Sequence, residues 1–219
     1  MSDEAERLEI CHLSCHEQNV RSLRDTVLKK AKTTTPRLGI EIYGTLVKCT
    51  RDRAGKNARL CNVNGEVPDA IKFLQLMTQV FQAENVFLIP YAGRHGRRLP
   101  EIEHWLVNTL YVTKTVGIRK ENIIFHEHRV GRNGKGPIAK RFRLTHYIDD
   151  DEENLQDVYR GFHGNAAVEM EDNGGELFLF PRSGDIANSK TPRPFFGKLV
   201  PKRVMPVRGF ADIVKRLSK

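Results

Sequence analysis

Short apolar runs recur along the chain, and longer segments with apolar residues at helical spacing lie between them. Two of the runs, residues 85–90 (NVFLIP) and 122–125 (NIIF), lack the polar alternation of a half-buried strand. Such continuous runs are typical of strands that are buried on both faces of a sheet. The predicted strands are residues 38–47, 85–90, 122–125, 145–148 and 177–180.

Helices are predicted wherever apolar residues recur three and four positions apart. They cover residues 3–32, 69–82, 100–111, 134–142, 151–160 and 210–217, and a loop or small hairpin is expected at 48–66. Strands that alternate with helices predict an α/β fold, a Rossmann-like parallel sheet with helices on both faces. We expect an N-terminal helical extension at 1–35, the α/β domain at 36–182, and a basic segment at 183–219 that ends in a helix.

Composition is that of a soluble globular protein. The 219 residues are 39% hydrophobic and 29% charged. No apolar run approaches the roughly 20 residues that a membrane helix needs. The acidic start, MSDEAERLE, does not resemble a secretory signal or a transit peptide. Four cysteines do not suggest a disulfide framework, so we expect a reducing compartment, the cytoplasm.

The net charge of +9 is concentrated toward the C-terminus. Residues 190–219 carry a single acid, Asp212, and nine basic residues: Lys190, Arg193, Lys198, Lys202, Arg203, Arg208, Lys215, Arg216 and Lys219. Such a segment is either an electropositive surface for nucleic acid or another polyanion, or a solvated tail. No aromatic-plus-basic RNA motif accompanies it.

Polar residues stand where two of the predicted strands end. GIEIYGTLVK (39–48) carries Glu41 and Tyr43, and Asp149 and Asp150 follow the strand at 145–148. Because parallel strands deliver their carboxyl ends to one edge of a sheet, these residues are expected to meet there. The acids that follow (Asp151, Glu152 and Glu153) are interpreted as first-turn residues that favour the helix dipole.

Several segments, in order along the chain, resemble the haloacid dehalogenase superfamily of Rossmann-like phosphohydrolases. EIYGTL (41–46) stands where that family has a D-x-D-G-T-L turn, and VFLIPYAG (86–93) stands where it has a strand ending in Ser or Thr. PDAIKFLQLMTQVF (68–81) is similar to its first crossover helix, and GKGPIAKRFRLTHYIDDDEENL (134–155) is similar to a subgroup with a lysine, a short helix and THF(V/I)DD. The resemblance implies the family's fold without a large cap domain.

The resemblance also implies a role for each matching position. Lys135 stands at the catalytic, phosphate-binding lysine, and Thr45 stands at the phosphate-binding threonine of the turn. Glu41 stands at the nucleophile and Tyr43 at the general acid and base. In the family, acids at the end of the fourth strand help to hold Mg²⁺, which implies magnesium ligands at Asp149 and Asp150. The resemblance also implies Glu41, at the nucleophile position, as a magnesium ligand.

Three of these positions depart from the family pattern. Glu41 is one methylene longer than aspartate, and a shift of about 1 Å in a reacting atom costs about 10²-fold in rate. Tyr43, with a reference pKa of about 10, is a poor base near neutrality. Pro90, at the Ser position, offers a phosphate neither a hydroxyl nor an N–H group.

Two functional hypotheses follow from this pattern. The first is a catalytically degenerate relative that acts as a scaffold or interaction subunit and contacts protein or nucleic acid through its basic C-terminal segment. The second is a magnesium-dependent phosphohydrolase that uses Glu41 as an unusual nucleophile or to activate water. A phosphatase assay with Mg²⁺ separates the two.

Other patterns have simpler interpretations. Cys11, His12, Cys15 and His16 share a predicted helix, and one helix does not bring all four side chains onto a single zinc ion. Cys49 and Cys61 flank a basic loop and are interpreted as small apolar residues beside a turn. GRNGKG (131–136) lacks the spacing and the Ser or Thr of a Walker-type loop. His126 and His128 are expected at the surface.

Overall fold

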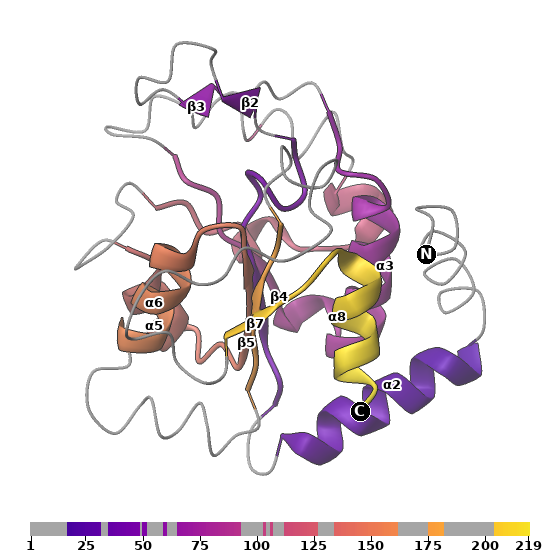
Figure 1. Ribbon diagram of the computed structural model, residues 1–219. Coiled ribbons are helices and arrows are strands. Elements are labelled where there is room, and N and C mark those ends of the chain that lie inside the picture. Colours follow the sequence, from indigo (N-terminus) through magenta and orange to yellow (C-terminus); the bar gives the residue numbers. More distant parts are fainter. Residues whose placement is uncertain are drawn as a thin grey trace.

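A computed structural model gives the fold of the chain (Figure 1). It describes residues 17–31, 35–48, 50–51, 59–60, 65–92, 103, 106, 112–126, 134–161, 175–181 and 204–219. The helices are α2 (Glu17–Lys30), α3 (Ala70–Phe81), α5 (Lys135–Arg141), α6 (Glu152–Gly161) and α8 (Phe210–Leu217), with short helical turns η1 (Ala83–Asn85), η4 (Val112–Val116) and η5 (Lys120–Asn122). The strands are β1 (Leu38–Ile40), β2 (Thr50–Arg51), β3 (Arg59–Leu60), β4 (Val86–Leu88), β5 (His146–Asp149), β6 (Leu177–Leu179) and β7 (Val204–Pro206).

A five-stranded parallel sheet forms the centre of the fold, in the order β4-β1-β5-β6-β7. β1 lies between β4 and β5, with Gly39 opposite Phe87 on one side and Tyr147 on the other. Residues 123–126 extend the sheet beyond β4, because Ile123 bridges Leu88 in the parallel sense and the Ile124 amide donates to the Leu88 carbonyl at 2.8 Å. The predicted Rossmann-like α/β architecture is confirmed.

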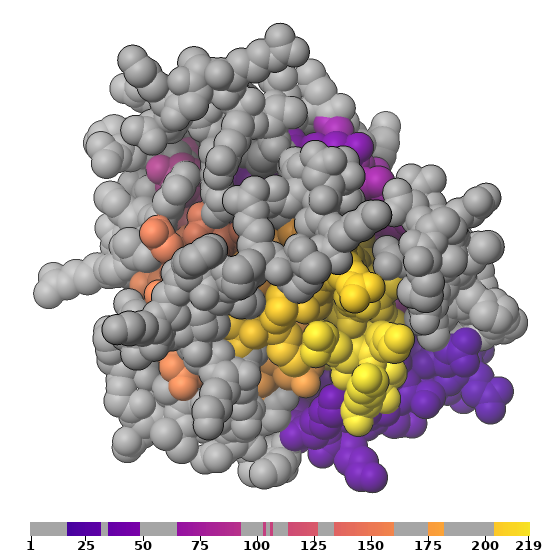
Figure 2. All heavy atoms as spheres, viewed as in Figure 1, coloured from indigo at the N-terminus to yellow at the C-terminus, as the bar shows by residue number. Residues whose placement is uncertain are grey.

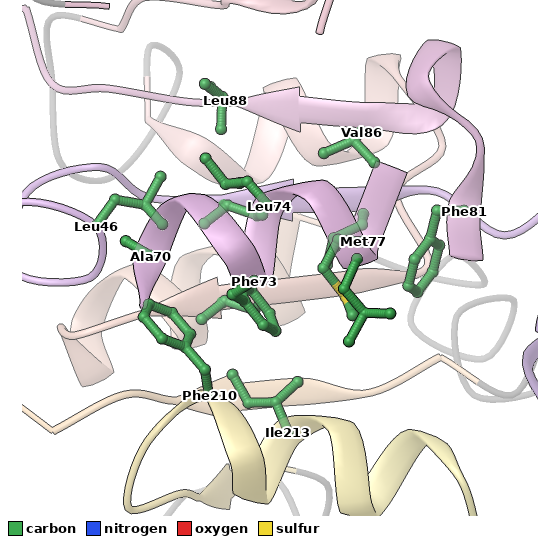
Figure 3. Packing of buried hydrophobic residues seen from close by; sticks show 14 of the residues in the cluster. Leu46, Ala70, Phe73, Leu74, Met77, Phe81, Val86, Leu88, Phe210 and Ile213 are labelled. Atoms are coloured by element: carbon green, nitrogen blue, oxygen red, sulfur yellow. The ribbon is translucent and has the colours of Figure 1, made fainter. Parts of the chain in front are cut away.

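One face of the sheet is covered by α2, α3 and α8 (Figure 1). The core on this side combines residues of α3 such as Phe73 and Met77 with Ile40 of β1 and Ile148 of β5. Figure 3 shows Phe73 of α3 against Phe210 of α8, whose rings stack with their centroids 4.4 Å apart. The predicted amphipathic helix at 69–82 therefore buries its apolar side as expected.

The opposite face is covered by α5 and α6. Here Tyr147 of β5 packs with Ala139 of α5 and Leu155 of α6, all fully buried. Gly39 makes this packing possible, because a β-carbon there would lie 2.6 Å from a ring carbon of Tyr147. A side chain in the middle of β1 is thus excluded by the neighbouring strand.

The two ends of the described chain meet on the α3 side of the sheet. α2 and α8 lie side by side at the surface in Figures 1 and 2, and the Lys30 ammonium donates to the Arg216 carbonyl at 3.4 Å. Leu23 and Val27 of α2 belong to the same apolar cluster as Ile213 and Leu217 of α8. The segments expected as an N-terminal extension and a C-terminal appendage thus share one core with the sheet.

The observed elements follow the sequence expectations with three differences. The strand expected at 122–125 is not regular, because η5 covers Lys120–Asn122 and only isolated bridges, Ile123 to Leu88 and His126 to Tyr91, follow it. The strand expected at 38–47 ends at Ile40, and residues 43–47 turn. β7 was not predicted, because Val204–Pro206 is short and contains a proline, which suits only an edge strand. β2 and β3 pair antiparallel, which confirms a small hairpin within 48–66. Most of the helix expected at 100–111 lies outside the described residues.

None of the described helices combines the length and the apolar character that spanning a membrane requires.

Candidate functional site

Three charged side chains meet inside the protein at the carboxyl edge of the sheet. Glu41 directly follows β1, Asp149 is the last residue of β5, and Lys135 is the first residue of α5. Their exposed fractions are only 3%, 0% and 1% respectively. Because charges are rarely buried unless paired, their arrangement decides what this edge can do.

Lys135 forms ion pairs with both carboxylates. Its ammonium contacts Glu41 Oε2 and lies 2.5 Å from Asp149 Oδ2. Burial by itself lowers the pKa of Lys135, but Asp149 and Glu41 outweigh it and hold that pKa well above its usual range. The ammonium is therefore a fixed internal cation between two carboxylates.

Both oxygens of Glu41 are engaged. Oε1 accepts hydrogen bonds at 3.0 Å from the backbone amides of Ile42 and Tyr43, while Oε2 faces Lys135 and lies 3.9 Å from His126 Nε2. Burial raises the pKa of Glu41, but Lys135 and His126 lower it more, and the result is about 2. Glu41 is ionised at neutral pH and held by its neighbours.

Asp149 is held equally closely. Its Oδ1 accepts from the Asp151 amide at 2.9 Å and from Asn154 Nδ2 at 3.1 Å, while Oδ2 faces Lys135. Burial, together with the Glu41 charge, raises the pKa of Asp149 against the opposing effect of Lys135. Asn154 on α6 is thus part of the site, one helical turn after the acids that the sequence singled out.

The turn after Glu41 brings backbone close to the second acid. Gly44 has a positive φ of 84°, and a β-carbon there would lie 2.4 Å from the Asp150 carboxyl group, so only glycine fits. Thr45 in the same turn is fully buried, and its hydroxyl has no hydrogen-bond partner in the part of the chain that is described. The predicted turn therefore places Gly44 against Asp150.

The remaining positions of the resemblance surround this cluster. Tyr43 is 9% exposed and bridges Val47 across the turn. Pro90 is buried beyond β4, and its carbonyl accepts from the His126 amide at 3.2 Å. This link fixes residues 123–126 along the β4 side of the sheet, which carries His126 toward Glu41.

Asp151 stands at the start of α6, where the sequence placed an acid for its interaction with the helix dipole. Its Oδ1 accepts from the Glu153 amide at 3.0 Å, and the Leu155 amide donates to its carbonyl at 3.2 Å. The side chain therefore caps the first turn of α6, where an acid also interacts well with the helix dipole.

Tyr147 lies beneath the buried lysine. The Lys135 ammonium is 5.8 Å from the centre of its ring, and the ring is fully buried. Burial raises the pKa of Tyr147 well above its usual value, so the phenol is neutral. Its hydroxyl has no hydrogen-bond partner among the described residues.

The structure brings Glu41, Lys135 and Asp149 into direct contact, and Tyr43, Thr45 and Asp150 stand in the adjoining turn and strand end. The expectation that His126 lies at the surface was wrong, because its side chain is 4% exposed and faces Glu41. A strand-end histidine after an apolar run, NIIFH, was the available signal for this. No sequence signal distinguished Asn154 from other helical residues.

The magnesium prediction finds no support in this arrangement. Within the described ranges, no group of three or more His, Cys, Asp or Glu side chains is arranged to hold a metal ion. The two facing carboxylates already share the Lys135 ammonium, so a further cation would have to compete with that ammonium. Magnesium at Glu41, Asp149 and Asp150 stays a prediction.

Several other sequence candidates lie outside the described residues: Cys11, His12, Cys15, His16, Cys49, Cys61 and His128. Five basic residues of the predicted C-terminal contact segment, Lys190, Arg193, Lys198, Lys202 and Arg203, lie outside them too, so that contact stays a prediction. Comparison with protein-family models, with curated proteins and with solved structures found no match for this chain.

Proposed function

We propose that this chain is a catalytically degenerate α/β protein of the haloacid dehalogenase type that acts as an interaction subunit. Support for the resemblance comes from strand order and position. β1 is central, and Glu41, Lys135 and Asp149 gather at the carboxyl edge, where open α/β sheets place their sites. Fold alone does not carry a function, so the proposal depends on the chemistry of this edge.

The bridging of Glu41 and Asp149 by Lys135 carries the proposal. A nucleophilic carboxylate needs a free oxygen that can reach a phosphorus atom. Glu41 Oε1 accepts two backbone N–H groups, and Oε2 contacts Lys135, so an attack on phosphorus would have to compete with these partners. The three side chains act as a structural ion cluster in the core.

The charge at the edge also disfavours a phosphate ester. Lys135 supplies one positive charge, which is already neutralised between Glu41 and Asp149. Asp150 and Asp151 stand beside them and are 7% and 5% exposed. Among the described residues this region holds more acids than bases, so a phosphate dianion that enters it would meet Coulomb repulsion.

Two neighbouring residues, Tyr43 and Pro90, also argue against phosphate hydrolysis. Tyr43 holds a bulky phenol at the position that needs an acid and base, and Pro90 lacks both a hydroxyl and an N–H donor for phosphate. The buried Pro90 carbonyl is used by the His126 amide. Turnover would require several side chains to change partners at once.

Hydrolysis of a generic aryl phosphate, with and without Mg²⁺, tests the proposal. We expect the wild-type rate to equal that of Glu41→Ala in either condition. Turnover that requires Mg²⁺ and is lost in Glu41→Ala would overturn it and establish the phosphohydrolase hypothesis. Calorimetric titration with MgCl₂ alone, on wild type and Asp150→Asn, tests the predicted metal separately.

A further inference from the structure

Basic side chains from four separate segments gather at the edge of the sheet opposite the ion cluster. Parallel strands begin at this edge, and α2, α5 and α8 end there (Figure 1). We name this surface the basic edge and define it by six residues: Lys29, Lys30, Arg37, Lys140, Arg143 and Lys215.

Direct contacts join these segments. Lys30 reaches the Arg216 carbonyl at the end of α8 and lies 3.8 Å from Glu176, just before β6. The Arg37 guanidinium, just before β1, donates to the Phe142 carbonyl at the end of α5 at 2.9 Å. The basic edge therefore crosses the whole thickness of the fold, from the α8 layer to the α5 layer.

Few acids lie among the described residues at this edge; residues 162–174, which precede β6 and include Glu169, Glu171 and Asp172, lie outside them. Glu176 pairs with Lys30, and Glu84 in η1 and Glu121 in η5 stand toward the β4 side. Of the ion pairs between described residues, none involves Lys29, Lys140, Arg143 or Lys215, although all four side chains are exposed. Their charges face solvent without a carboxylate partner among the described residues.

Helix dipoles explain part of this pattern, because basic residues are favoured in the last turn of a helix. They do not explain Arg143, which follows the end of α5 with a positive φ of 51°. Glycine or asparagine takes this conformation at lower cost, so the chain holds an exposed arginine where a neutral residue would suit the backbone better.

We propose that the basic edge binds the phosphodiester backbone of nucleic acid. Since a helix with its side chains is about 10–12 Å across, an edge with a helix layer on each side of the sheet spans at least about 20 Å, which matches several successive phosphates. Membrane-surface helices combine basic and large apolar exposed residues, whereas Leu28, at 44%, is the sole exposed large apolar side chain among the described residues. The inference rests on the proposed interaction role and names its partner.

The test uses the full chain with a fluorescein-labelled RNA duplex and a DNA duplex, each of about 20 base pairs, titrated at about 50–300 mM salt. The edge variant is Lys140→Gln/Arg143→Gln/Lys215→Gln. The matched control, Lys48→Gln/Lys72→Gln/Arg208→Gln, removes the same charge near the carboxyl edge, beside the turn and the starts of α3 and α8. Both variants are first checked for wild-type melting.

We expect wild type to bind with a steep salt dependence. The edge variant should lose at least about tenfold in affinity and show a salt slope shallower by about 3, with the control within about twofold of wild type. Binding to the RNA duplex alone would indicate that the 2′-hydroxyl groups are required. Equal affinity for the RNA and DNA duplexes would indicate that the phosphodiester backbone alone is recognised.

Equal losses in both variants would reduce the effect to net charge and overturn the proposal. It is equally overturned if wild type binds neither duplex at the lowest salt, or binds only vesicles rich in anionic phospholipid or an acidic peptide. The phosphatase assay is independent of these outcomes. A chain that lacks turnover yet binds neither duplex would refute the basic edge and leave the degenerate site untouched.

Discussion

Among single residues, Lys135 has the largest consequences for the molecule. It is a fully buried cation with two carboxylate partners, Glu41 and Asp149. Removing one member of such a cluster leaves its partners charged and buried, and that costs far more than an exposed pair contributes.

We therefore predict that Lys135→Met lowers the free energy of unfolding by about 3–5 kcal/mol, since Glu41 and Asp149 lose their counter-charge. Urea unfolding followed by circular dichroism measures this. Lys140→Met, on the exposed side of the same helix, is the matched control and should change stability by less than about 0.5 kcal/mol. Similar small losses in both variants would contradict the structural role of the cluster.

His146 gives a prediction on pH. Its ring is buried against Phe81 and within 2.8 Å of the Thr145 hydroxyl, and burial, with the Lys30 charge, lowers its pKa from 6.5 to about 3. Because the folded pKa lies below the unfolded one, the unfolded chain binds the extra proton. Stability is complete above about pH 6.5 and falls as the pH drops toward 3.

Relative to His146→Gln, wild type should lose about 1.4 kcal/mol of stability per pH unit between pH 6 and 4, as one differential proton requires. Urea unfolding of both proteins at several pH values measures the difference, which also cancels the other titrating groups. Parallel pH curves for the two proteins would show that His146 is not held neutral by the fold.

Among the elements, the end of α5 matters both for the stability of the protein and for the proposed nucleic-acid surface, because Arg143 follows it. Arg143 follows α5 in the left-handed region, and its amide donates to the Lys140 carbonyl at 3.1 Å. We predict that Arg143→Gly stabilises the protein by about 0.5–1 kcal/mol, because glycine accepts this φ without steric cost. Thermal melting measures it.

The control for that prediction is Arg141→Gly, two residues earlier, at the last helical residue of α5. It should destabilise by about 0.5–1 kcal/mol, because glycine in a regular helix costs conformational entropy. If both glycine variants destabilise equally, backbone strain at Arg143 does not exist in solution.

Helices and strands were the features that the sequence predicted best. Apolar runs such as 85–90 and the spacing in 69–82 express burial directly, so β4 and α3 lie where they were expected. β7 was missed because three residues that include Pro206 carry no pattern of their own, and only pairing with β6 makes them a strand. Its identity depends on a neighbour that is distant in sequence.

The candidate site, like the helices and strands, was predicted in part from the sequence. Motif order indicated that Glu41, Lys135 and Asp149 would meet, and the sheet does bring them together. Their mutual neutralisation and the inward position of His126 depend on distances of a few ångströms. One-dimensional spacing does not fix such distances, so the charge state of the site was outside the reach of the sequence.

Across the whole molecule, the question is whether the chain ends belong to the same cooperative unit as the sheet. Leu23 of α2 is 4% exposed and lies in the cluster that contains β1 and α8 residues, whereas Leu28, five residues later on the same helix, is 44% exposed. Leu23 and Leu28 therefore allow the same Leu→Ala substitution to be compared at a buried and at an exposed position of α2.

We predict that Leu23→Ala lowers the free energy of unfolding by about 2–4 kcal/mol, because it leaves a cavity in the shared core. Leu28→Ala, which empties no buried space, should change it by less than about 0.5 kcal/mol. Chemical unfolding followed by far-ultraviolet circular dichroism and by the near-ultraviolet circular dichroism of buried aromatic side chains such as Tyr147 measures both, and the two probes should give one coincident transition. If Leu23→Ala only separates an early loss of helix from an unchanged main transition, α2 is an appendage. The chain ends would then not be part of the folding unit that holds the Glu41–Lys135–Asp149 cluster.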